Sequence, residues 1–114
     1  MTKSPQPYLA LIQRALTHIE QYRPQDKRDF LAQPVLQDAI LMRLQVIGEN
    51  LARIRRLDED AYHEMADDSW RKLIGLRNVI SHGYESIDHE EIWQIVKEEL
   101  PTFAVTIEAL VEHS

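Results

Sequence analysis

Apolar residues recur along the chain at intervals of three and four, the spacing of one face of an α-helix. The first stripe predicts a helix over roughly residues 8–22, which ends before Pro24. The segment 23–29 that follows is polar and predicts a connection. The members of this first stripe are Leu9, Ile12, Leu16 and Ile19.

The widest apolar surface starts at Pro34, a residue that suits the first turn of a helix. Two parallel stripes predict the most buried helix of the protein, in contact with several others. Gly48 interrupts this helix at a cost of about 1 kcal/mol relative to alanine, which indicates either close helix packing or a tolerated glycine. One stripe is Leu36, Ile40, Leu44, Ile47, Leu51 and Ile54, and the other is Val35, Ala39, Met42 and Val46.

The acidic segment 58–69 predicts at most a short helix. Ser69 then suits the N-cap of a further helix that begins at Trp70. We expect this helix to end close to His82 or Gly83. Its core stripe is Leu73, Leu76 and Ile80.

The last apolar stripe follows Asp88, which suits an N-cap, and Pro101 within it predicts a kink or break. No segment alternates with period two for long enough to predict a strand. The sequence therefore predicts an all-α, up-and-down bundle of four main helices, with room for one short helix, in a single domain over residues 1–114. The last stripe consists of Trp93, Val96, Leu100, Phe103, Ile107 and Leu110.

Composition excludes several classes of protein. Hydrophobic residues make up 44% of the chain and charged residues 28%, as in ordinary globular proteins. The chain has no cysteine, so neither a disulfide framework nor a zinc–thiolate site is possible. No apolar run approaches the ~18 residues of a membrane span, and the first ten residues do not look like a secretion signal. We therefore expect a cytoplasmic protein without a membrane partner.

The formal net charge of −6 disfavours general adhesion to nucleic acid. Two local basic clusters are present, 53-RIRR-56 and the group of Arg71, Lys72 and Arg77. Either cluster could contact phosphate groups or could be ordinary solvated helix surface.

The segment 76-LRNVISHGYES-86 has two interpretations. In the simpler one, Arg77 and His82 face the negative end of the helix dipole, and Gly83 ends the helix in a left-handed conformation. In the other, Arg77 lies at the margin of the apolar face, and Asn78 and His82 form an i, i+4 pair beside it. A continuous helix separates Arg77 and His82 by about 140°, so their convergence needs an unwound helix end or a second chain.

The same segment resembles the HepT-like toxins of the HEPN superfamily. In 77-RNVISHGY-84, an Arg-x4-His-x-Tyr pattern carries an asparagine directly after the arginine. The resemblance extends over about residues 35–110, through 40-ILMRLQVIGENLARI-54, 70-WRKLIGLRNVISHGY-84 and 87-IDHEEIWQIVKEELP-101.

The resemblance implies a HEPN-like four-helix-type bundle that forms a homodimer or a larger assembly. It also implies a metal-independent endoribonuclease toxin of a type VII toxin–antitoxin system, without a cofactor, which cleaves RNA and has tRNA as a candidate substrate. Arg77 and His82 would be the catalytic pair, and Asn78 would support them. The partner would be a minimal nucleotidyltransferase antitoxin that neutralises the toxin by AMPylation of Tyr84.

These side chains suit RNA cleavage without a metal. A histidine with an ordinary pKa near 6.5 can accept or donate a proton at neutral pH, and arginine matches phosphate oxygens with a planar fork. One histidine does not easily act as base and acid at once. A twofold dimer with Arg77 and His82 of both copies around one groove would supply two.

Other interpretations remain open. The chain could be a non-catalytic HEPN module that binds a nucleotidyltransferase and its substrate, or a plain helical interaction protein. The carboxylates Asp38 and Glu49 could approach the motif, or they could be solvated or ion-paired.

Overall fold

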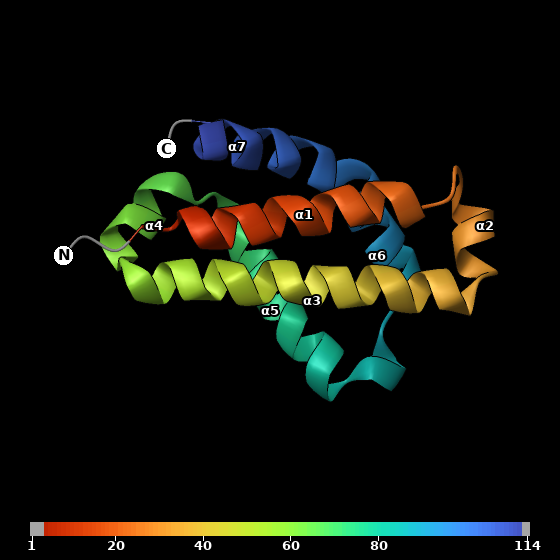
Figure 1. The fold of residues 1–114 in the computed structure, drawn as a ribbon. Helices are drawn as coiled ribbons and strands as arrows, with labels where there is room; N and C mark the ends of the chain where they lie inside the picture. Colours follow the sequence, from red (N-terminus) through yellow and green to blue (C-terminus); the bar gives the residue numbers. More distant parts are fainter. Residues whose placement is uncertain (1–3, 113–114) are drawn as a thin grey trace.

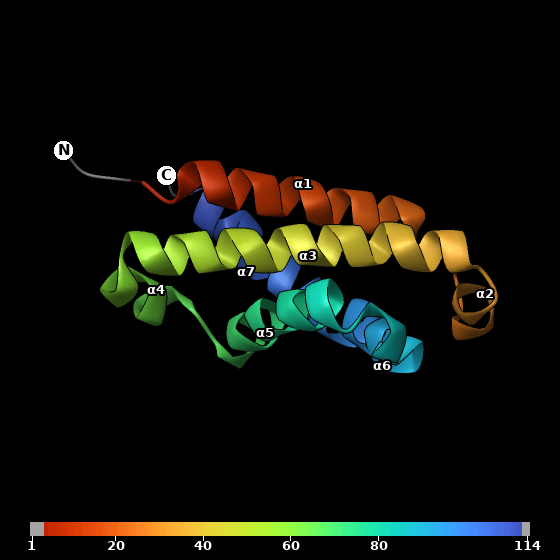
Figure 2. The same cartoon turned by 90° about the horizontal axis from the view of Figure 1, so that it is seen from below.

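In the computed structural model, which describes residues 4–112, the long helix α3 (Pro34–Leu57) lies between α1 (Gln6–Tyr22) and α5 (Asp68–His82) (Figures 1 and 2). No β-strand occurs in that range, so the predicted all-α class is confirmed. The remaining elements are α2 (Lys27–Leu31), α4 (Glu59–Met65), the 3₁₀ turn η1 (Tyr84–Ser86), α6 (His89–Gln94), the π-helical turn η2 (Ile95–Glu99) and α7 (Leu100–Glu112).

The helix α3 is the most extensively buried element, as its apolar pattern predicts. Its first stripe points into the core, and five of the six members are fully buried. The second stripe is only partly buried, because Val35 and Met42 are exposed. The buried members of the first stripe are Ile40, Leu44, Ile47, Leu51 and Ile54.

The first helix ends at Tyr22 as predicted and begins at Gln6, two residues before the predicted start. It buries one face against α3 and α7. On the α7 side, Phe103 and Ile107 are buried in the same core. The chain thus forms a bundle in which α1 and α3 run along most of its length (Figure 1).

The prediction of a plain connection over 23–29 is wrong. The short helix α2 begins at Lys27. The Asp26 side chain caps it by accepting a hydrogen bond from the Asp29 amide at 2.9 Å. Phe30 anchors it with a fully buried ring. Its two apolar residues, Phe30 and Leu31, are adjacent and show no helical periodicity, so the stripe pattern does not reveal such a helix.

Aspartates cap the later helices. Asp58 caps α4 and Asp88 caps α6, the latter as predicted. The predicted cap at Ser69 is wrong by two residues, because Asp67 accepts hydrogen bonds from the Ser69 amide at 2.9 Å and from the Ser69 hydroxyl. A carboxylate is favoured there because the N-terminal end of a helix carries positive potential.

The last helical segment is interrupted next to Pro101, as predicted. After α6 the backbone makes the π-helical turn η2, in which the Leu100 amide donates to the Ile95 carbonyl. Pro101 follows as the second residue of α7, and because proline has no N–H group it cannot donate a hydrogen bond to the preceding turn. None of the helices within residues 4–112 is long and apolar enough to cross a membrane.

Candidate functional site

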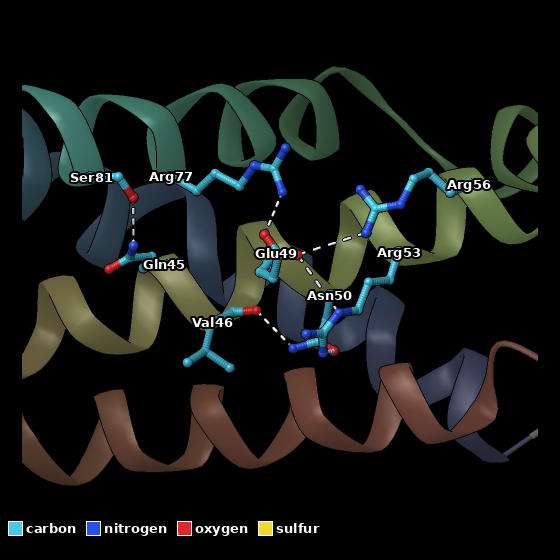
Figure 3. Close-up of polar contacts among 8 residues, drawn as sticks. All are labelled: Gln45, Val46, Glu49, Asn50, Arg53, Arg56, Arg77 and Ser81. Atoms are coloured by element: carbon cyan, nitrogen blue, oxygen red, sulfur yellow. Dashed lines mark hydrogen bonds and ion pairs between the residues drawn. The ribbon is translucent and has the colours of Figure 1, made fainter.

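The second half of α5 and the turn η1 run antiparallel to residues 38–49 of α3, and three side-chain pairs join them. Residue numbers rise along the 76–86 segment as they fall along α3, so the motif is held at three successive points. Figure 3 shows two of these contacts. The pairs are Arg77 with Glu49 at 2.5 Å, Ser81 with Gln45 at 2.6 Å, and Tyr84 with Asp38.

Arg77 faces α3 and is mostly enclosed. Its side chain is 20% exposed, and its Nη1 donates to Oε2 of Glu49. Its Nε is buried and has no hydrogen-bond partner among the described residues. The predicted position of Arg77 at the margin of the apolar face is confirmed, and Glu49 is the carboxylate that reaches it.

Gly48 brings the two helices together at this point. A Cβ atom at residue 48 would lie 2.6 Å from the carbonyl oxygen of Leu73 and 3.0 Å from the Cβ atom of Arg77. Backbone atoms cannot move out of the way as a flexible side chain can. Of the two interpretations of this glycine, close helix packing is therefore correct.

Two further arginines, both on α3, lie close to the Glu49 carboxylate. Arg53 Nε and Arg56 Nη2 each lie 3.7 Å from its Oε1 atom, while Arg77 approaches from α5 (Figure 3). Three guanidinium groups therefore share one carboxylate. The sequence separates Arg53 and Arg56 from Arg77 as two clusters, and the fold joins them. Arg53 and Arg56 follow Glu49 by four and seven residues, which places all three on one face of α3. This spacing is the sequence signal for two of the three contacts.

His82 and Asn78 lie on the exposed face of α5. Neither side chain makes a hydrogen bond to another residue in the described part of the chain. Since α5 stays helical through His82, Arg77 and His82 point to different sides of the helix. A single chain does not bring the two together.

The helix end differs from the simple termination model. Gly83 has φ −135° and ψ 36°, which is not left-handed, so that expectation is wrong. Its amide donates to the Val79 carbonyl at 2.7 Å, and the turn η1 follows. Ser86 closes this turn through its amide and hydroxyl, which donate to the Gly83 carbonyl at 2.9 Å and 2.8 Å. These bonds make a left-handed residue unnecessary.

Tyr84 is half-exposed, and its hydroxyl donates a hydrogen bond to Asp38. This bond raises the pKa of Tyr84 above its ordinary value, with smaller contributions from burial and from the Asp38 charge. The phenol is therefore protonated at neutral pH and is accessible beside an acceptor for its proton.

Metal-binding side chains do not gather at this site. Within residues 4–112, no group of three or more histidine and carboxylate side chains is placed to hold a metal ion. The functional groups at this site are those of arginines and carboxylates, one exposed imidazole and one phenol.

Known proteins resemble this chain over most of its length. A family model described as "Ribonuclease HepT-like" matches residues 12–110. "Putative RNase MJ1380" of Methanocaldococcus jannaschii is 29% identical over 98 residues, which cover 86% of this chain and 87% of that protein. "Probable ribonuclease HepT" of Thermococcus cleftensis is 29% identical over 111 residues, which cover 96% of this chain and 98% of that protein. No solved structure matches the chain.

Proposed function

The chain belongs to the HepT-like ribonuclease family, and on that premise we propose that it is a metal-independent endoribonuclease toxin. Its active site is shared between the two copies of a twofold dimer and uses Arg77, Asn78 and His82. The observation that carries this proposal is the position of Arg77 and His82 on different sides of one continuous helix. A second copy of α5 supplies a second His82, which one chain does not provide.

The exposed face of α5 is the surface through which the copies meet. It presents Asn78 and His82 next to Val79, an apolar side chain that is half-exposed in the single chain. In a twofold interface the same patch contacts itself, so both copies of His82 come to one groove. The dimer also concentrates positive charge on a chain whose net charge is −6.

The chemistry follows from these groups. One copy of His82 removes the proton of the RNA 2′-hydroxyl, which attacks the adjacent phosphorus, and the other copy protonates the leaving 5′-oxygen. Arg77 stabilises the charge on the pentavalent phosphorane through its planar donor fork. The products are a 2′,3′-cyclic phosphate and a 5′-hydroxyl.

Regulation acts through Tyr84. A minimal nucleotidyltransferase antitoxin transfers AMP from ATP to the Tyr84 hydroxyl, which attacks the α-phosphorus as pyrophosphate leaves and the phenolic proton passes to Asp38. The hydrogen bond from Tyr84 to Asp38 supports this proton path. The added phosphodiester brings a negative charge and a bulky nucleotide to Tyr84, and both hinder the binding of RNA phosphate to this end of the site.

The central experiment is cleavage of purified RNA, with tRNA as the first substrate, in the presence of a metal chelator. Wild-type protein should produce 2′,3′-cyclic phosphate ends, whereas Arg77→Ala and His82→Ala should not. Circular dichroism should show equal helicity in all three proteins. Cleavage at the wild-type rate by His82→Ala would reject the catalytic assignment.

One observation favours the alternative, a non-catalytic module that binds a nucleotidyltransferase and its substrate. In the single chain, Arg77 is already ion-paired with Glu49. This alternative predicts a stable complex with the nucleotidyltransferase and no RNA cleavage by the wild type. Intact-mass spectrometry of wild type and Tyr84→Phe, each incubated with the nucleotidyltransferase and ATP, tests the modification. Equal AMP incorporation into both would remove Tyr84 from the mechanism.

A further inference from the structure

We propose that Arg53, Arg56 and Arg77 form one binding track for the phosphate backbone of RNA beside the cleavage site. Glu49 is the internal counter-ion of this arginine track, and an RNA phosphate takes its place. The inference rests on the proposed ribonuclease function and extends it. It assigns a substrate-positioning role to Arg53 and Arg56, which lie outside the motif.

The charge balance of the cluster is the first argument. Three guanidinium groups surround one carboxylate, so the cluster has an excess of positive charge in a protein that is acidic as a whole. Such an excess favours a further anion at the same place. Glu49 is itself 40% exposed, so an incoming phosphate can reach the position that it occupies.

The geometry leaves donors free for that anion. Arg53 and Arg56 lie 3.7 Å from Glu49, which is too far for an N–H···O hydrogen bond. Their side chains are 44% and 60% exposed. Their guanidinium groups are therefore near the carboxylate and still accessible to phosphate oxygens.

The buried side chain of Asn50 also orients Arg53. Its Nη1 donates to Oδ1 of Asn50 at 3.3 Å, and Asn50 is buried and donates in turn to the Val46 carbonyl at 2.9 Å (Figure 3). A buried amide that holds an exposed arginine reduces the conformational entropy lost when the arginine binds a ligand. This support distinguishes Arg53 from a freely moving surface arginine.

The arrangement of the track suits a nucleic acid strand. From Glu49 to Arg56 the helix rises by roughly 10 Å, so the track is long enough to contact more than one phosphate. Arginines near the end of α3 also interact favourably with the helix dipole. The dipole does not account for the approach of Arg77 from a different helix to the same carboxylate.

RNA binding by the full-length His82→Ala protein tests the track without cleavage. The probe is a fluorescein-labelled single-stranded oligouridylate, and its Kd is measured over a range of salt concentrations. Adding Arg53→Gln and Arg56→Gln should weaken binding by roughly tenfold or more. The slope of log K against log salt should fall by about 1.4, since each phosphate contact to a single strand contributes about 0.7.

Arg14→Gln with Arg28→Gln is the matched control, because it removes the same charge from exposed arginines on α1 and α2. The control should leave the slope unchanged. Arg53→Lys with Arg56→Lys keeps the charge and should retain most of the slope while losing part of the affinity. Glu49→Gln should bind the same RNA more tightly, because the internal competitor is gone.

Cleavage assays separate the two proposals. In the background with His82 intact, Arg53→Gln with Arg56→Gln should raise KM with little change in kcat, as expected of positioning residues. Light scattering should show the same oligomeric state as the wild type. If the wild type cleaves RNA and the double variant keeps the wild-type KM and salt slope, the track is refuted while the proposed function stands. A wild type that neither binds nor cleaves RNA would refute both.

Discussion

At the scale of single residues, the chain holds Arg77 and His82 in different ways. Arg77 is mostly enclosed and tied to α3 through Glu49, whereas His82 is exposed and unsupported by its own chain. A residue that contributes little to folding can be removed without loss of structure. His82 therefore offers the cleaner test of catalysis.

His82→Ala should lower the rate of RNA cleavage by about 10²- to 10⁴-fold, the usual contribution of a general acid or base. The free energy of unfolding should change by less than about 0.5 kcal/mol, because the side chain is exposed. His63→Ala is the matched control, since His63 is exposed on α4. Initial rates of RNA cleavage and urea denaturation provide the two measurements. Equal losses of activity in both variants would argue against a specific role for His82.

Asp38→Asn should lower the pKa of Tyr84 towards the ordinary tyrosine value of about 10, because the hydrogen bond to the Asp38 carboxylate is the main cause of the raised pKa and the Asp38 charge adds to it. With Asp38 present, the hydrogen bond stabilises the fold below about pH 10, and this contribution is lost as pH rises through the raised pKa. Ultraviolet titration of the phenolate gives the shift, with Tyr84→Phe identifying the Tyr84 component. Asp60→Asn on α4 should leave the titration unchanged, and an unchanged titration of Asp38→Asn would contradict the assigned cause.

At the scale of helices, the contact between α3 and α5 depends on Gly48. Gly48→Ala should destabilise the protein by about 1–3 kcal/mol, because the added methyl group meets the Leu73 carbonyl and the Arg77 Cβ atom. Gly75→Ala on α5 is the control, since its Cβ atom has no neighbour within 4 Å in the described chain. It should leave stability unchanged or raise it by up to about 1 kcal/mol. Urea denaturation measures both, and similar results for the two variants would reject the close-contact explanation.

At the scale of the whole molecule, a shared site makes activity depend on both copies. When wild type and His82→Ala are refolded together in equal amounts, activity per total protein should fall to roughly one quarter, because only wild-type pairs hold two histidines. Independent sites would leave roughly one half. Titration of the mixing ratio distinguishes a squared from a linear dependence.

Val79→Arg is expected to separate the proposed dimer, since a twofold interface through α5 places the two introduced charges against each other. Val79 is half-exposed in the single chain, so the fold of each chain should tolerate the substitution. Light scattering should show a monomer, and RNA cleavage should be lost. Unchanged mass and activity would place the dimer contact elsewhere.

The sequence by itself determined the main helices and the family. Periodic apolar residues predicted α1, α3, α5 and the final segment, because helical periodicity depends on local spacing and is visible in one dimension. The pattern in 77-RNVISHGY-84 indicated the family, and the family model confirms it. The expected helix over this segment also predicted that Arg77 and His82 lie on different sides of the helix axis, since a continuous helix has a known rotation per residue.

The tertiary structure decided which of these residues meet. Glu49 and Arg77 are 28 positions apart in the sequence, and their contact depends on how closely α3 approaches α5 at Gly48. The short helix α2 forms because the core has a place for Phe30, and Gly83 avoids the left-handed region because η1 supplies the hydrogen bonds at the helix end. Contacts between elements depend on packing distances in three dimensions, which periodicity along one chain does not contain.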